Sequence, residues 1–293
     1  MGFTEEQKLR LDKLGDVTYF DDMCTSPEDW LSRCQGFEIV CSWMAGLRDK
    51  YSELKDVFIS VPFVGVGTFA DPKILKDKNI TISNSPGCNR QSVAEWIIYM
   101  LLSTTRRLDT YLKTSTPVSL PFSPKGLADK KITILGNGNI GKTVSAICEA
   151  MGMSVMIFKR GDDLTESVRD ADLVVDVLST NPTTKGLLDN KFFKSLKMGT
   201  IFISVTTSTI EDFDAIFDAL NEGRLSFVAH DVADAKPGDA TNELYKRLCA
   251  HPNVYTTPHI AGFSDATTKV GNDMMIDNVE AWIKGNPINV FTG

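Results

Sequence analysis

Short apolar runs alternate with helical patterns along most of this 293-residue chain. A short apolar run fits a buried strand, whereas apolar residues at i, i+3, i+4 spacing fit one face of a helix. The expected strands are 16–20, 38–41, 57–61, 80–83, 132–135, 155–158, 173–178, 200–205, 225–232 and 254–257. The expected helices are 4–14, 27–34, 92–113, 140–151, 190–196, 211–222 and one within 269–293, and a proline-containing loop is expected at 114–125. This alternation predicts an α/β protein with parallel sheets.

A glycine-rich turn at 136–141 is the first segment that indicates a ligand-binding function. It reads GNGNIG, has the spacing G-x-G-x-x-G, and separates a strand from a helix and a second strand. This order is typical of a βαβ unit that binds a dinucleotide. Gly136 permits the tight turn, Gly138 lets the pyrophosphate approach the backbone, and Gly141 lets helix and strand pack closely. We expect the pyrophosphate at the helix N-terminus, on the backbone of Asn139 and Ile140.

The far end of the same unit bears on which dinucleotide is bound. NAD-binding units place an acidic residue there, about 20 residues on, to bind the ribose 2′-hydroxyl. Lys159 stands near that position and is followed by Arg160. Because these cations would pair with a 2′-phosphate, NADP is the expected cofactor, with NAD possible. In the alternative interpretation both are solvated loop charges, and Asp162 or Asp163 binds the ribose.

Composition argues against several other classes of function. The net charge is −7, and no run of Lys or Arg indicates a nucleic-acid surface. No apolar run approaches the ~20 residues of a membrane span. The three histidines are not paired at ligand spacing, so no metal site is expected. The six cysteines show no C-x-x-C spacing and no signal peptide is recognisable, so we expect reduced thiols in a cytoplasmic protein.

Further motifs stand in a fixed order along the chain. They are VGVG at 64–67, NSPG at 84–87 with SVAE at 92–95, LSTNPTTKGL at 178–187, DV at 231–232 and PHIA at 258–261. In this order they resemble the D-isomer-specific 2-hydroxyacid dehydrogenase family, whose members include glycerate and phosphoglycerate dehydrogenases and glyoxylate/hydroxypyruvate reductases. The resemblance covers nearly the whole length.

The resemblance implies two domains with the active site in the cleft between them. Residues 98–267 would form a Rossmann-type doubly wound parallel sheet that binds NAD(P). Residues 1–97 and 268–293 would form a smaller flavodoxin-like α/β substrate domain. The implied activity is that of an NAD(P)-dependent oxidoreductase, which transfers a hydride between the nicotinamide and a small anionic 2-keto or 2-hydroxy acid. A homodimer is also implied.

The resemblance also assigns roles around the cofactor and the substrate. The backbone of Val66 and Gly67 would hold the substrate carboxylate. Ser179, Thr180 and Asp231 would lie beside the cofactor. Trp43, at the carboxyl end of an expected strand, would wall the substrate pocket, although a core residue would show the same pattern.

The family's catalytic residues are a His acid/base, an Arg that grips the substrate, and a Glu that supports the His. His259 matches the His, but ungapped flanks place Thr207 at the Arg position and Lys236 at the Glu position. A threonine offers a hydroxyl but no charge and no bidentate fork, and a cation near an imidazole lowers its pKa. One interpretation is an active, rewired enzyme in which Lys236 supplies the positive charge. The other is a dinucleotide-binding regulator or sensor without catalysis. The equal alternative for Lys236 itself is a solvated loop lysine without a role in the site.

Overall fold

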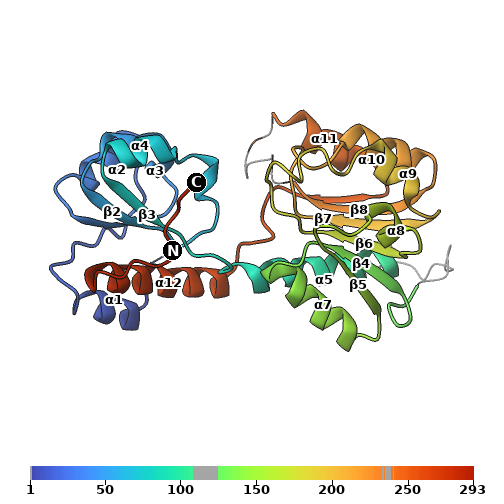
Figure 1. Ribbon diagram of the computed structural model, residues 1–293, viewed down its shortest axis with the longest axis horizontal. Helices are drawn as coiled ribbons and strands as arrows, with labels where there is room; N and C mark the ends of the chain where they lie inside the picture. Colours follow the sequence, from blue (N-terminus) through green and yellow to red (C-terminus); the bar gives the residue numbers. More distant parts are fainter. Residues whose placement is uncertain (1, 108–124, 233, 235–238, 240) are drawn as a thin grey trace, which may run out of the picture. The chain divides into compact units, whose positions relative to one another are not determined.

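The computed structural model describes residues 2–107, 125–232, 234, 239 and 241–293 (Figure 1). The chain divides into two compact units. Unit 1 comprises Met1–Asn89 and Phe263–Gly293, and unit 2 comprises Arg90–Gly262. Each unit is built around a parallel sheet with helices, which confirms the predicted α/β class.

Within its described residues, unit 2 has a parallel sheet in the order β5-β4-β6-β7-β8-β9. Its strands are β4 Lys131–Leu135, β5 Ser154–Phe158, β6 Leu173–Asp176, β7 Thr200–Ser204, β8 Leu225–Asp231 and β9 Val254–Thr257. The chain runs from β4 to β5 on one side and then crosses to β6 on the other side of β4. In such doubly wound sheets, ligands bind outside the carboxyl ends of the strands at this reversal of order.

Helices cover both faces of the unit 2 sheet (Figure 1). The helices are α5 Arg90–Arg106, α7 Asn139–Ala150, α8 Leu164–Val168, α9 Asn190–Ser195, α10 Phe213–Asn221 and α11 Glu243–Ala250. On one face α5 and α7 pack Leu101 and Val144 against Ile134. On the other face, Phe193 of α9 meets Phe202 of β7 edge-on, with ring centroids 5.4 Å apart. Because both faces are covered, the strands have nearly continuous apolar sequences.

Unit 1 contains a smaller parallel sheet in the order β1-β2-β3. Its strands are β1 Ile39–Cys41, β2 Val57–Ser60 and β3 Ile80–Ser83. Its helices are α1 Glu5–Leu11, α2 Pro27–Cys34, α3 Leu47–Lys50, α4 Pro72–Asp77 and α12 Asp265–Ile283, with short 3-10 turns at Tyr51–Glu53 and Val66–Thr68. Trp282 of α12 stacks on Phe58 of β2 with ring centroids 4.5 Å apart, so the C-terminal helix is part of this unit's core.

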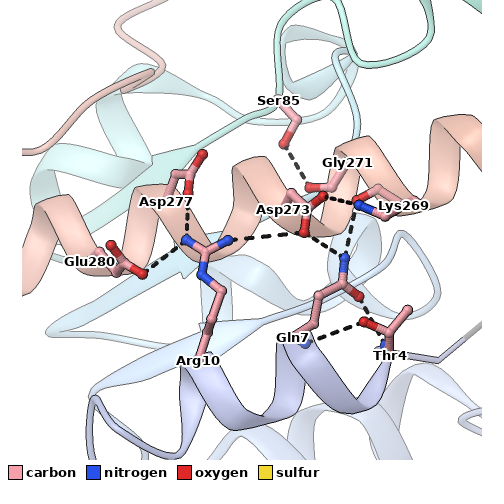
Figure 2. A network of polar contacts seen from close by, with 9 residues as sticks. All are labelled: Thr4, Gln7, Arg10, Ser85, Lys269, Gly271, Asp273, Asp277 and Glu280. Carbon is pink, nitrogen blue, oxygen red and sulfur yellow. Dashed lines mark hydrogen bonds and ion pairs between the residues drawn. The ribbon is translucent and has the colours of Figure 1, made fainter.

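Polar side chains join α1 to α12 (Figure 2). Gln7 Nε2 donates to Asp273 Oδ1 at 2.8 Å, and Gln7 is buried. The Arg10 guanidinium donates to Asp277 at 2.6 Å and to Glu280 at 2.9 Å. Exposed ion pairs contribute little to stability individually, roughly 0–1 kcal/mol, but several together fix an orientation. The first helix of the chain is thereby held against the last one.

One predicted strand is absent, and the predicted helices do not include α3, α4, α8 and α11. Residues 16–20 form no strand. Instead, the Tyr19 hydroxyl donates to Asp12 Oδ1 at 2.9 Å, which ties this segment to the end of α1, and Phe20 is 50% exposed. Helix α11 was not predicted, although Leu244, Tyr245 and Leu248 stand at helical spacing and pack on the core. Residues 108–113 of the predicted helix and most of the predicted loop at 114–125 lie outside the described residues.

Candidate active site

The glycine-rich turn lies at the reversal point of the unit 2 sheet, between the ends of β4 and β6. Gly136 has a φ of +118°, and a Cβ added there would lie 3.0 Å from the carbonyl oxygen of Val177. A Cβ added at Gly141 would overlap the carbonyl oxygen of Gly136. At Gly138, by contrast, an added Cβ would meet no described atom within 4 Å. Two glycines of the motif are therefore required by protein contacts, and the third faces open space.

The first turn of α7 has the properties of an anion site. Gly138 is its N-cap and makes no side-chain capping bond, so the first backbone N–H groups, at Asn139 and Ile140, have no intrahelical acceptor. These groups and the helix dipole favour a phosphate. The cradle therefore fits the pyrophosphate of a dinucleotide, because it offers donors, positive potential and an absent side chain at Gly138.

The segment after β5 presents two exposed cations. Lys159 and Arg160 make no ion pair within the part of the chain that the structure describes. The Lys159 N–H donates to Asp162 Oδ2 at 2.8 Å, and the Asp162 N–H donates back to the Lys159 carbonyl at 3.1 Å. Asp163 accepts from the Glu166 N–H at 3.0 Å and caps α8. Both aspartates are thus engaged with backbone groups of their own turn.

The loop after β6 carries Ser179 and Thr180, and both residues are exposed. The Ser179 carbonyl accepts from Asn181 Nδ2 and from Thr184 Oγ1, each at 2.8 Å. Thr184 Oγ1 also accepts from the Asn181 N–H at 3.0 Å. These bonds fix the loop from within and leave its exposed tip at the carboxyl edge of the sheet.

Asp231, the last residue of β8, fixes the backbone around His259. Its Oδ1 accepts from Thr257 Oγ1 at 2.6 Å and from the Ile260 N–H at 2.8 Å, and its Oδ2 accepts from the Ala261 N–H at 2.8 Å. His259 is exposed and has a φ of +54°. Left-handed backbone is uncommon outside glycine and costs about 1–3 kcal/mol, so it marks a position that the surrounding bonds impose.

The turn after β7 carries Thr207. The Thr207 carbonyl accepts from the N–H groups of Ile210 at 2.9 Å and Glu211 at 3.2 Å, and Thr207 Oγ1 accepts from the Thr209 N–H at 3.3 Å. Ser208 is held by Asp234, which accepts from its N–H at 2.7 Å. A hydroxyl that already accepts still has its proton to donate. Lys236, the other residue proposed for this region, lies outside the described residues.

A buried polar cluster lies directly beneath that turn. Asp176, Ser204 and His230 are paired in register on adjacent strands, so their side chains share one face of the sheet. Glu211 reaches them from the segment before α10: His230 Nε2 lies 2.8 Å from its Oε2, and the Ser204 hydroxyl contacts its Oε1. All four residues are at most 3% exposed.

The two buried carboxyl groups have opposite pKa shifts. Burial, and then the charge of Glu211, raises the pKa of Asp176 well above its ordinary value. Burial also acts to raise the pKa of Glu211, but His230 and the hydrogen bonds to the carboxylate outweigh it and lower the pKa overall. Asp176 therefore holds a proton more readily than Glu211, the usual outcome for two carboxyl groups in one buried site.

Unit 1 contains the residues expected to contact substrate. The side chain of Val66 is fully buried, and its N–H donates to the Val64 carbonyl at 2.9 Å. Gly67 is exposed, and an added Cβ there would lie 3.4 Å from the Phe291 ring. Trp43 is half-buried after β1, and its carbonyl accepts from Ser42 Oγ at 2.7 Å. Of the two loop residues, Gly67 thus leaves its backbone more accessible.

A family comparison identifies this arrangement. The family described as "D-isomer specific 2-hydroxyacid dehydrogenase, NAD binding domain" matches residues 97–261. The chain belongs to this family. The predicted resemblance is thereby confirmed, and the activity class is that of an NAD(P)-dependent dehydrogenase or reductase.

Several named relatives of this 2-hydroxyacid dehydrogenase family member match most of the chain. A glycerate dehydrogenase of Methylorubrum extorquens is 26% identical over 90% of this chain and 88% of its own length. A hydroxypyruvate reductase of Blautia hydrogenotrophica is 25% identical over 96% of this chain and 93% of its own. A D-3-phosphoglycerate dehydrogenase of Haemophilus influenzae is 28% identical, and the match spans 58% of its length.

Solved structures show the same fold. An acyclic imino acid reductase (Bsp5) in complex with NADPH and D-Arg superposes with a TM-score of 0.81 at 22% identity, over 99% of this chain and 96% of its own. A D-2-hydroxyisocaproate dehydrogenase gives a TM-score of 0.78 at 20% identity, over 99% and 98% of the two chains. These likenesses establish the architecture of the 2-hydroxyacid dehydrogenase family for this chain.

The buried cluster is the part of this dehydrogenase that sequence reasoning missed. Asp176, Ser204 and His230 each end or nearly end an apolar strand, and that shared position was the available signal. Their pairing with Glu211 depends on strand order and on the path of a loop, which hydrophobic patterns do not specify. Within the described residues, no helix is long and apolar enough to cross a membrane, and no group of His, Cys, Asp and Glu could hold a metal ion.

Proposed function

We propose that the protein exchanges a hydride between NADP(H) and a small 2-keto or 2-hydroxy acid, with His259 as the acid/base. The observation that carries this proposal is the set of three bonds by which Asp231 fixes the left-handed backbone at His259. A general acid must be held in one position to be effective. The bound nicotinamide supplies the hydride, and the imidazole supplies or accepts the proton of the substrate oxygen.

The proposed substrate contacts are made by one backbone group, one hydroxyl and one cation. The Gly67 backbone would hold the carboxylate, with Trp43 beside it. The Thr207 hydroxyl would donate one hydrogen bond where an arginine would donate two. Lys236 is proposed to add positive charge. A single neutral donor is weaker than a bidentate cation, so we expect a larger KM than an arginine would give.

Turnover on a panel of 2-keto acids and aldehydes, measured with NADPH and with NADH, tests this proposal. We expect NADPH-dependent reduction of at least one small 2-keto acid. Tight NADPH binding without turnover of any compound would contradict the proposal and favour the regulator. The relatives named above are dehydrogenases and reductases, so the comparisons do not favour a regulator.

The preference for NADP follows from Lys159 and Arg160. A pair of cations at the strand end would bind the 2′-phosphate, and Asp162 and Asp163 are occupied by backbone N–H groups. Replacing both Lys159 and Arg160 by alanine should raise the Kd for NADPH at least about 100-fold, because each charge-assisted hydrogen bond contributes about 1.5–3 kcal/mol and two are lost. The Kd for NADH should change less than about two-fold. Isothermal titration calorimetry with both cofactors measures this difference.

Arg169→Ala is the matched control, because this exposed arginine pairs with Glu166 at 2.6 Å on the same unit. It should leave both dissociation constants unchanged. An equal loss for NADPH and NADH in the double variant, or a wild-type Kd for NADH at or below that for NADPH, would show that the two cations do not read the 2′-phosphate.

Assembly and compartment are also proposals. We propose a homodimer, as the family resemblance implies, and α5 exposes Tyr99 (65%) and Leu102 (39%) on its surface. A cytoplasmic location is proposed because the six cysteines are free thiols. Sedimentation equilibrium and cell fractionation test these two points separately.

A further inference from the structure

We propose that Glu211 is a positioning residue that acts through Thr206 to present the Thr207 hydroxyl at the carboxyl edge of the unit 2 sheet. This inference rests on the proposed function, because it assumes that Thr207 contacts the substrate. It adds a residue that neither the sequence motifs nor the family comparison assigns.

The hydroxyl of Thr206 links the two buried acids. Thr206 Oγ1 lies 2.9 Å from Asp176 Oδ2 and 2.9 Å from Glu211 Oε1, and the residue is 5% exposed. A hydroxyl has one proton, so it can donate to only one of these acids. Because Asp176 holds a proton more readily than Glu211, we assign the Thr206 proton to Glu211 and the proton of the second contact to Asp176. Each of these two contacts is then a hydrogen bond with one donor and one acceptor.

Other donors converge on the same carboxylate. Ser204 Oγ donates to Oε1 of Glu211, and the Ser204 oxygen accepts the Thr206 N–H at 3.1 Å. His230 Nε2 must carry a proton toward Oε2, because an ionised carboxylate only accepts. The ring of Phe213 covers His230 at a centroid distance of 5.0 Å. Glu211 is thus fixed by strands β7 and β8 and shielded from water.

Glu211 holds the turn at two adjacent residues, one through its side chain and one through its backbone. Glu211 contacts Thr206 through its side chain, and its own N–H donates to the Thr207 carbonyl at 3.2 Å. The next residue, Ser208, is anchored separately by Asp234 at 2.7 Å. Thr207 therefore lies between two anchored neighbours. With Thr206 directed into the buried cluster, the half-buried Thr207 takes the outward position of the turn.

Single substitutions separate the charge of Glu211 from its bulk. Glu211→Gln places an amide N–H₂ among donors that all need an acceptor. Thr206→Val keeps the shape of Thr206 and removes the linking hydroxyl, whereas Thr206→Ser retains it. Asp176→Asn is the matched control. The asparagine N–H₂ can donate to Thr206 as the protonated acid does. The asparagine oxygen can accept from the Leu178 N–H, which lies 2.9 Å from Asp176 Oδ1 in the structure.

The test is steady-state kinetics of the full chain on the best 2-keto acid of the panel, with the Kd for NADPH measured in parallel. We expect Glu211→Gln and Thr206→Val each to lower kcat/KM at least about 10-fold, mainly through KM, with the Kd for NADPH within about two-fold. Thr206→Ser and Asp176→Asn should stay within about three-fold of wild type.

A double-mutant cycle distinguishes positioning from a general structural role. If Glu211 acts through Thr207, the loss from Thr206→Val in a Thr207→Val background should be much smaller than its loss alone, because the hydroxyl being positioned is already gone. The positioning role would be overturned if the fold-losses in kcat/KM from Thr206→Val and Thr207→Val multiplied in the double variant. It would also be overturned if Glu211→Gln and Thr206→Val both kept wild-type kinetics. In either case, turnover by the wild-type protein would still support the proposed function. A wild-type protein that reduces no 2-keto acid would overturn both.

Discussion

Replacing His259 by asparagine is expected to lower kcat/KM for the 2-keto acid by about 10²–10⁴-fold, the usual contribution of a positioned general acid. Asparagine is the informative replacement because it tolerates left-handed backbone better than most residues. The φ of +54° at this position, and the bonds from the Ile260 and Ala261 N–H groups to Asp231, should therefore survive. The Kd for NADPH should stay within about two-fold, so the loss lies in the chemical step.

Stopped-flow measurement of single-turnover hydride transfer, together with fluorescence titration of NADPH, gives both quantities on one protein sample. His251→Asn is the control. That histidine precedes β9, at the amino edge of the sheet, and its Nδ1 accepts from the Asn253 N–H at 3.2 Å. It should leave kcat unchanged. A His259→Asn enzyme with at least one third of wild-type kcat/KM would remove His259 from the mechanism.

The unit 2 sheet could be predicted because buried parallel strands have simple sequences. The runs at 132–135, 155–158 and 254–257 are apolar or β-branched and end at glycine, proline or charged residues, and each became a strand. The segment 16–20 has similar residues and did not become a strand. Its side chains pack on α1 through Tyr19 instead, because a strand requires a neighbour and local pattern does not supply one.

In the candidate site, too, local features could be predicted from the sequence and long-range ones could not. The glycine turn is local in sequence, so its conformation could be inferred from spacing alone. Thr207 could be located from its flanks, but the reason for its fixed position could not. That reason involves Asp176, Glu211 and His230, which are separated by 35 and 19 residues along the chain and meet only because β6, β7 and β8 are adjacent. Long-range polar contacts of this kind follow from topology.

Substitutions at the glycines of the turn test the cofactor site most directly. Gly136 and Gly141 are in contact with protein atoms, whereas Gly138 is the position proposed to contact the cofactor. Gly141→Ala should lower the free energy of unfolding by about 3 kcal/mol or more, since its Cβ would overlap the Gly136 carbonyl in a buried contact that cannot easily relax. Gly138→Ala should change it by less than about 1 kcal/mol. Its φ of −80° suits alanine, and no described atom lies within 4 Å of the added Cβ.

The order of effects should reverse for cofactor binding. If the pyrophosphate lies against the backbone at Gly138, the methyl group of Gly138→Ala occupies that space, and the Kd for NADPH should rise about 10-fold to 100-fold, the equivalent of one charge-assisted hydrogen bond. Urea unfolding and calorimetric titration measure the two effects separately. Gly126→Ala is the matched control, because it too is exposed in unit 2 and has no described atom near an added Cβ. A Gly138→Ala protein that binds NADPH as tightly as the Gly126→Ala protein would place the pyrophosphate elsewhere, whatever the stability of Gly141→Ala.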